Sequence, residues 1–208
     1  MIEAGIFSSE ASFDKRYIPD HEKLAEVVRY LKDLGIRVVL TSGSFDLLHI
    51  GHILYLEAAR ACGDMLIVGV DSDERIRQRK GPTRPIVLEQ ERMRILASLR
   101  AVDIITAEKA DGDGWQLFKK IRPNVLVVSR STGDATFGEE LVNELKRYCD
   151  EVKVLPPQAE TSTTARVRSL MVNGITQVSP KILAAIMPEF ASLLDKTVKN
   201  VLAEEEKK

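Results

Sequence analysis

The most informative stretch of the sequence is Ser42-Gly43-Ser44-Phe45-Asp46-Leu47-Leu48-His49-Ile50-Gly51-His52. It directly follows an apolar, β-rich run and opens a segment with helical periodicity. A strand that passes through a glycine-containing turn into a helix is typical of strand–helix–strand units. Open sheets built from such units bind ligands at the carboxyl ends of their strands, so this turn is the first candidate for a functional site.

Short, nearly continuous apolar runs recur on both sides of this turn. Such runs are typical of strands that are buried on both faces of a parallel sheet. Segments with helical periodicity separate them, and strand alternating with helix indicates an α/β fold. With right-handed crossovers, we expect a doubly wound, Rossmann-like parallel sheet of about five strands. The expected strands span residues 36–40, 65–70, 102–106, 125–128 and 152–155.

Two further helices are expected to flank this unit. Residues 20–34 have an amphipathic pattern that ends at Gly35. Ser179-Pro180 is suited to begin a long C-terminal helix with an apolar stripe. This stripe packs either on its own domain or on a second chain, since helical spacing does not separate the two alternatives. We expect an N-terminal extension over residues 1–35, a central domain over 36–174 and a C-terminal helical extension over 175–208.

The composition narrows the class of protein. Lys and Arg number 30 against 31 Asp and Glu, so the net charge is −1. Proteins that hold a nucleic-acid backbone over a large surface are usually basic, so we expect no nucleic-acid partner. The apolar runs are too short for a membrane span, and the N-terminus has no signal-peptide pattern. Cys62 and Cys149 lack metal-like spacing and are expected to be buried, reduced thiols. We therefore expect a cytoplasmic globular protein without membrane contact.

His49 and His52 carry the strongest chemical signal. They are three residues apart at the start of a helix, so their rings should point the same way. Gly43 permits close approach of a phosphate to the backbone, and Gly51 allows tight packing between the rings. The free amides of a helix start attract an anion. A single histidine is more often a core residue, but a pair in this context indicates a site for charge developing on a phosphoryl group.

The stretch from Gly43 to His52 resembles the signature of the cytidylyltransferase-like family of nucleotidyltransferases. Three further segments are similar to that family in the same order, so the resemblance covers roughly residues 36–172. They are the end of the second strand at residues 68–73, a cationic segment and helix arginine within 77–92, and a Ser-Thr-Thr motif within 161–167.

The resemblance implies a reaction and a role for each matching residue. A phosphate oxygen of a small phosphorylated acceptor attacks the α-phosphorus of ATP or CTP, and pyrophosphate leaves. Catalysis is then positioning and charge stabilisation, with Mg²⁺ on the triphosphate and few protein ligands for the metal. The implied catalytic residues are His49, His52, Lys80 and Arg92. The implied nucleotide-binding residues are Ser42, Gly43, Ser44, Phe45, His49, Gly51, His52, Ser162, Thr163 and Thr164, and the implied acceptor-binding residues are Asp71 and Arg84.

Residues 80–85 and 88–93 resemble the adenylyltransferases that act on heptose 1-phosphate. Glycerol-3-phosphate cytidylyltransferases share the histidine turn and the Ser-Thr-Thr motif. Residues 129–134 read Ser-Arg-Ser-Thr-Gly-Asp, where the heptose enzymes tend to have Lys-Gly-Gly-Asp. The base and the acceptor therefore stay open between ATP with a sugar 1-phosphate and CTP with a polyol phosphate.

Two alternatives lie outside this reaction. An aminoacyl-tRNA synthetase shares the double-histidine turn, but the chain lacks the lysine-rich second signature and the basic surface of those enzymes. A nucleotide sensor without turnover is also compatible with the sequence. Members of the family are commonly dimers, so the resemblance implies a homodimer.

Overall fold

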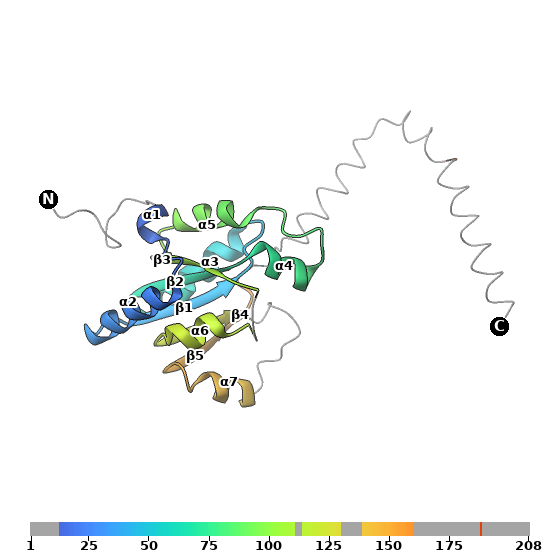
Figure 1. Cartoon of the computed structure of the whole chain (residues 1–208). Helices are drawn as coiled ribbons and strands as arrows, with labels where there is room; N and C mark the ends of the chain where they lie inside the picture. Colours follow the sequence, from blue (N-terminus) through green and yellow to red (C-terminus); the bar gives the residue numbers. More distant parts are fainter. Residues whose placement is uncertain (1–12, 111–113, 130–138, 160–187, 189–208) are drawn as a thin grey trace. The chain divides into compact units, whose positions relative to one another are not determined.

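Five parallel strands form one sheet in the computed structural model, which describes residues 13–110, 114–129 and 139–159 together with residue 188 (Figure 1). The strand order is β3-β2-β1-β4-β5, so the chain runs outward to one edge and then crosses back to build the other half. This is the doubly wound arrangement that the sequence predicts. The strands are β1 (Val38–Gly43), β2 (Met65–Asp71), β3 (Ile104–Glu108), β4 (Val125–Ser129) and β5 (Glu151–Leu155).

Helices cover both faces of the sheet, because alternate residues of each buried strand point to opposite sides. Val38 and Leu40 of β1 belong to one core cluster, and Val39 belongs to the other. Helices α2, α6 and α7 contribute to the first cluster, and α3 and α5 to the second. The described helices are α1 (Phe13–Arg16), α2 (His21–Asp33), α3 (Ile50–Arg60), α4 (Asp73–Lys80), α5 (Glu89–Ala97), α6 (Gln116–Ile121) and α7 (Glu139–Leu145).

The N-terminal segment wraps the β3 edge of the sheet. Helix α1 and Tyr17 pack on the α5 side, and the Ile18 amide donates to the Ile105 carbonyl at 3.0 Å. The chain then continues into α2 on the opposite face, where Leu24 and Val28 are buried in the core. The amphipathic helix expected over residues 20–34 is therefore present, but the expected boundary at residue 36 does not separate it from the sheet.

Several element boundaries differ from the expected ones. Strands β1 and β3 begin two residues later than predicted and extend into polar residues, since Ser42 and Glu108 still pair with Gly69 and Asp71 of β2. The cationic segment is partly helical, because Ser72 caps α4 by accepting from the Arg75 amide at 3.2 Å. Strand β5 is only half-buried, as is usual for an edge strand, and not buried on both faces as expected.

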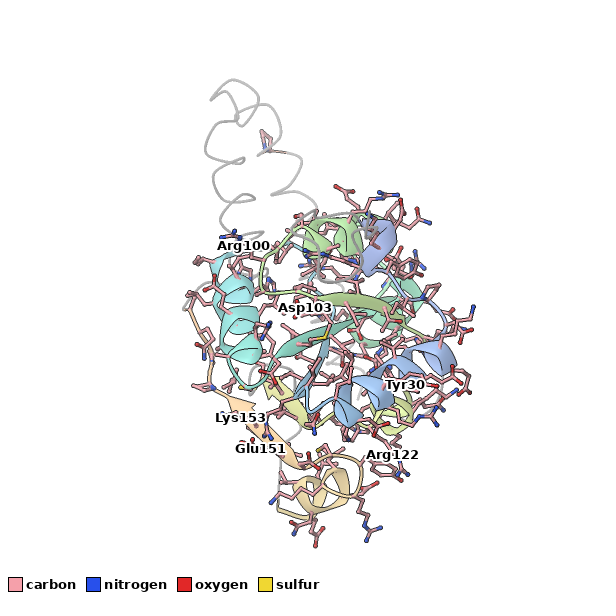
Figure 2. The ribbon with its side chains drawn as sticks, turned by 90° about the vertical axis from the view of Figure 1, so that its left-hand side faces the viewer. Tyr30, Arg100, Asp103, Arg122, Glu151 and Lys153 are labelled. Carbon is pink, nitrogen blue, oxygen red and sulfur yellow. The ribbon has the colours of Figure 1, made fainter. Side chains whose placement is uncertain are left out.

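Ion pairs lie along the amino end of the sheet. Asp103, just before β3, pairs with Arg60 at 2.9 Å, and Glu151, at the start of β5, pairs with Arg37 at 2.8 Å (Figure 2). These pairs are partly exposed and contribute little to stability. The carboxyl end of the sheet, by contrast, holds the buried charges described below.

Some expectations fall on parts of the chain outside the described residues. They concern the hydroxyl run Ser162, Thr163 and Thr164, residues 130–134 and the C-terminal helix from residue 180. Of the two cysteines, Cys149 is buried, Cys62 is half-buried and both are free thiols. Among the described residues, no helix has the length and apolar character needed to cross a membrane.

Candidate functional site

The double-histidine turn lies at the carboxyl end of β1 and the start of α3. His49 is the N-cap of α3, and its Nδ1 accepts from the Gly51 amide at 3.2 Å. The rings of His49 and His52 are stacked with centroids 3.9 Å apart and planes at 30°. Phe45 packs edge-on against His52 at 5.5 Å. The rings therefore lie together at the amino end of a helix, as the three-residue spacing predicts.

Gly51 fits closely between His49 and Ala159 at this turn. A Cβ atom on residue 51 would lie 3.0 Å from Cε1 and Nδ1 of His49 and 3.3 Å from Cβ of Ala159. Either contact is tighter than most Cβ contacts in proteins. The contact also shows that Ala159, shortly before the hydroxyl run, lies beside the histidine turn.

His52 is electrically neutral at physiological pH. Burial, helped by the nearby His49 and Lys80, lowers the pKa of His52 to about 4. Its Nδ1 has no hydrogen-bond partner within the described part of the chain. A neutral imidazole has one N–H donor and one acceptor nitrogen, so the ring can offer a hydrogen bond to a ligand without carrying charge.

Lys80 brings positive charge to the same turn. Lys80 is the last residue of α4, and its ammonium group donates to the Ser44 hydroxyl at 2.8 Å. Burial lowers the pKa of Lys80, with the neighbouring Arg79 acting in the same direction. A partly desolvated cation beside two imidazoles is suited to bind an anionic group.

The remaining predicted residues of the turn are positioned by the strand and by Phe45. Ser42 is still within β1 and pairs with Gly69 of β2. The Phe45 ring is buried, and a Cβ atom on Gly43 would lie 3.2 Å from it. The structure thus brings Ser42, Gly43, Ser44 and Phe45 into one turn with the histidines.

Asp46, which is not among the site residues predicted from the sequence, anchors this turn. Its buried carboxylate accepts from the amides of Ile86 and Val87 at 2.7 and 3.0 Å and from Arg84 at 2.8 Å. Burial raises the pKa of Asp46, but the hydrogen bonds from Val87, Arg84 and Ile86 outweigh it and hold the pKa below its usual value. Arg84, expected to bind the acceptor, is therefore paired with a turn residue.

Arg92 is fully buried under the turn. Its guanidinium donates to the carbonyls of Ser44, Asp71 and Val87 at 2.6, 2.9 and 2.9 Å. It also forms an ion pair with Asp73 at 2.7 Å. A guanidinium held in this way cannot reach a phosphate without breaking buried hydrogen bonds. In this structure Arg92 therefore contacts protein groups of the turn, of the end of β2 and of α4.

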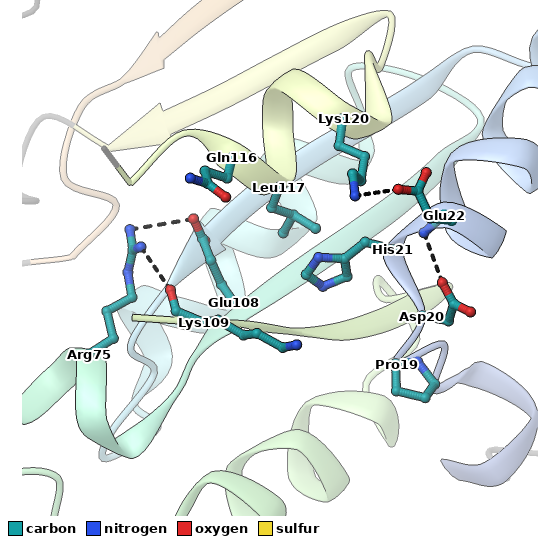
Figure 3. A pocket seen from close by; sticks show the side chains of 10 residues that line it. All are labelled: Pro19, Asp20, His21, Glu22, Arg75, Glu108, Lys109, Gln116, Leu117 and Lys120. Carbon is teal, nitrogen blue, oxygen red and sulfur yellow. Dashed lines mark hydrogen bonds and ion pairs between the residues drawn. The ribbon is translucent and has the colours of Figure 1, made fainter. Parts of the chain in front are cut away.

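Asp71 is the centre of a second buried charge cluster. It pairs with Arg75 at 2.8 Å and with Arg79 at 2.9 Å, so its carboxylate faces arginines of α4. Arg75 also contacts Glu108 of β3 at 3.4 Å (Figure 3). Burial raises the pKa of Glu108 to about 7, although Arg75 opposes this effect. Arg75 and Glu108 were missed from the sequence; the polar residue that directly ends the apolar β3 run was the available signal.

Comparison with known proteins agrees with this geometry. Residues 40–176 match the family model described as cytidylyltransferase-like. The bifunctional protein HldE of Sulfurimonas denitrificans is 39% identical over 142 residues, covering 66% of this chain and 30% of that protein. HldE of Pseudomonas paraeruginosa is 40% identical over 154 residues, covering 74% and 32%. The chain thus spans about a third of the length of these curated relatives.

A solved structure shares the fold at low sequence identity. The pantoate-beta-alanine ligase of Francisella tularensis, complexed with beta-gamma ATP and beta-alanine, aligns with a TM-score of 0.50. The match covers 74% of this chain and 72% of that one, at 15% identity. The arrangement of strands and helices is therefore one that other proteins also use.

Proposed function

Because the chain belongs to the cytidylyltransferase-like family of nucleotidyltransferases, we propose that it transfers an adenylyl group from ATP to a small phosphorylated substrate. The proposed acceptor is a sugar 1-phosphate, and pyrophosphate is released. The observation that carries the proposal is the stacked pair of His49 and His52 at the amino end of α3. The choice of ATP rests on the resemblance of residues 80–93 to the heptose 1-phosphate adenylyltransferases and on the identity to HldE proteins.

The proposed reaction depends on stabilisation of negative charge and not on proton transfer. An anionic oxygen of the acceptor forms a bond to the α-phosphorus, and the bond to the bridging oxygen breaks as pyrophosphate takes the electron pair. The nucleophile is already ionised, so no general base is needed. The neutral His52 ring, its partner His49 and the Lys80 ammonium would hydrogen-bond the phosphate oxygens that gain charge. The positive end of the α3 dipole acts in the same direction.

Buried ion pairs would hold these groups in place. Asp46 joins the histidine turn to residues 84–87, and Arg92 joins Ser44 to the end of β2. Groups that are fixed before the reaction do not have to reorganise when charge develops. We therefore give Arg92 and Asp46 positioning roles, and His49, His52 and Lys80 the direct contacts.

Further parts of the proposal concern the metal, the leaving group and the assembly. Mg²⁺ would bind together with the triphosphate, because phosphate oxygens are ligands that it prefers. Within the described ranges, no group of three or more His, Cys, Asp or Glu side chains is arranged to hold a metal ion. The hydroxyls of residues 162–164 would bind the leaving pyrophosphate, and the active form would be a homodimer.

A pyrophosphate-release screen tests the proposed reaction. The full chain is incubated with ATP or CTP, Mg²⁺ and a panel of sugar 1-phosphates and polyol phosphates. Release with ATP and a sugar 1-phosphate is the expected result. Release only with CTP and glycerol 3-phosphate would favour the cytidylyl alternative that residues 129–134 leave open. Nucleotide binding without release from any pair would favour a sensor.

Calorimetry separates the two bases directly. ATP and CTP analogues that resist cleavage are titrated into the protein with Mg²⁺ present. We expect tighter binding of the ATP analogue. A tenfold preference for the CTP analogue, about 1.4 kcal/mol, would overturn the adenylyl assignment.

A further inference from the structure

A polar cavity beside β3 has no role in the reaction proposed above. It lies at the carboxyl end of β3, between the N-terminal segment and α6, and has a volume of about 370 Å³ (Figure 3). Residues 19–22 form one wall, and Gln116 and Leu117 of α6 form another. Arg75 and Glu108 line its inner side. Cavities of this size hold small ligands.

Glu108 gives this cavity an unsatisfied acceptor. The residue is only 4% exposed, and its Oε2 makes no well-formed hydrogen bond among the described residues, although the Ser42 side chain is close enough to lower the Glu108 pKa. Its other oxygen is 3.4 Å from Arg75. A buried carboxylate oxygen without a partner costs free energy, which a ligand hydroxyl that donates to it would recover.

The charges around the cavity are largely compensated within the protein. Lys120 pairs with Glu22 at 2.6 Å, and Arg75 pairs with Asp71 at 2.8 Å. Asp20 accepts from the amides of Glu22 and Lys23 as the N-cap of α2. Lys109 also lines the cavity, but a phosphate that used Arg75 or Lys120 as well would have to displace their ion pairs. An uncharged, hydroxyl-rich group would only need to donate and accept hydrogen bonds.

The cavity adjoins the strand that leads into the histidine turn. A Cβ atom on Gly69 would lie 3.1 Å from Cβ of Ser42 and 3.4 Å from Oε2 of Glu108. Ser42 of β1 is the residue before the turn glycine, and only β2 lies between β1 and the strand that holds Glu108. A ligand with a phosphate at the turn could extend its other end toward Glu108.

We propose that this cavity binds the uncharged, hydroxyl-rich portion of the phosphorylated acceptor, with a ligand hydroxyl donating to Oε2 of Glu108. The inference rests on the proposed function, since it takes the acceptor to be a sugar or polyol phosphate. Residues 19–22 lie outside the stretch that matches the family model. His21, held by a 2.9 Å contact between its Nε2 and the Ala107 carbonyl, is then part of a wall that contributes to specificity from outside that stretch.

Titration with sugars that lack phosphate tests the cavity without requiring catalysis. D-mannose and D-sorbitol are added separately to the ¹⁵N-labelled full chain, and amide shifts are followed by NMR. We expect saturable shifts at Glu108, Gln116 and His21. Glu108→Gln keeps the shape of the side chain but removes its charge, and it should weaken binding at least tenfold. Glu108→Ala should abolish the shifts.

Matched controls separate this result from nonspecific effects and from the proposed reaction. Glu26→Gln removes an exposed carboxylate of α2 that does not line the cavity, so it should leave sugar binding unchanged. His49→Ala should also leave it unchanged. Absent or non-saturable shifts in the cavity, binding that the Glu108 variants do not weaken, or equal shifts with inorganic phosphate would each overturn the cavity assignment. Failure of the pyrophosphate screen alone would instead count against the proposed reaction.

Discussion

The imidazole ring of His52 is stacked on that of His49 with centroids 3.9 Å apart, and burial together with this neighbour keeps His52 neutral. The two histidines thus form one unit in which each ring fixes the environment of the other. His49 is also the N-cap of α3, so the same side chain begins the helix and faces the site.

Replacement of either histidine should impair turnover much more than folding. We expect His49→Ala and His52→Ala each to lower kcat about 10²-fold, the scale for loss of one preorganised donor. Melting temperature and nucleotide affinity should change little by comparison. Ile50→Ala, at an exposed position of the same turn, is the control and should keep near-normal kcat. Near-normal kcat in both histidine variants would contradict the phosphoryl role.

Lys80→Ala should raise the apparent KM for the triphosphate. A charge-assisted hydrogen bond is worth roughly 1.5–3 kcal/mol, so an increase of at least tenfold is expected. Arg77→Ala, on the same helix and exposed, is the matched control. Steady-state kinetics with the substrate pair identified by the screen would measure both. Equal KM values for the Lys80 variant and the wild type would mean that this cation is only a surface charge.

Arg92 and Arg94 are two residues apart on α5 but should behave differently. Arg92→Ala leaves Asp73 and three carbonyls without their buried donor, so we expect destabilisation by about 3–5 kcal/mol. Arg94 is exposed and contacts the Phe13 ring, so Arg94→Ala should cost at most about 1 kcal/mol. Urea unfolding measures both. If Arg92→Ala unfolds like the wild type but binds nucleotide weakly, its positioning role is wrong.

Glu108 should make stability depend on pH. Its folded-state pKa of about 7 is above the ordinary value of 4.5, so the folded protein binds more protons between these limits. The free energy of unfolding should therefore fall as the pH rises from about 4.5 through about 7, by about 1–3 kcal/mol. Glu108→Gln should remove this fall and be the more stable protein at pH 8. Parallel pH profiles of the two proteins would contradict the prediction.

Two buried threonines offer a matched test of hydrogen-bond satisfaction. The Thr41 hydroxyl is 2.7 Å from the Tyr55 hydroxyl, whereas the Thr106 hydroxyl has no partner within the described residues. Thr41→Val should destabilise the fold by about 1 kcal/mol, because Tyr55 loses a partner. Thr106→Val removes only an unsatisfied group and should be neutral or stabilising. Thermal unfolding of both variants would measure this, and a larger loss at residue 106 would show that its hydroxyl is bonded.

The strands, the helices and the position of the histidine turn could be predicted from local sequence patterns. Apolar runs such as that of β2 predict buried strands because each residue must match a nonpolar environment on both faces. The histidine pair is equally local, since three-residue spacing at a helix start brings two rings together. Both signals depend only on neighbours along the chain, and the structure agrees with them.

Which charged residues are buried, and which partners they have, became clear only from the folded structure. Arg92 and Lys80 are both basic residues of the same family-like segment. Arg92 is buried among four hydrogen-bond partners, whereas Lys80 contacts Ser44 of the histidine turn. Asp46 binds residues 84–87, and Glu108 contacts Arg75. These partners are more than 30 residues apart in the sequence, so local patterns do not predict their contact. A charge is stable in the interior only where folding supplies its partners, and those partners come from distant segments. The role of a charged side chain therefore follows from the packing of the whole sheet and not from the motif that contains it.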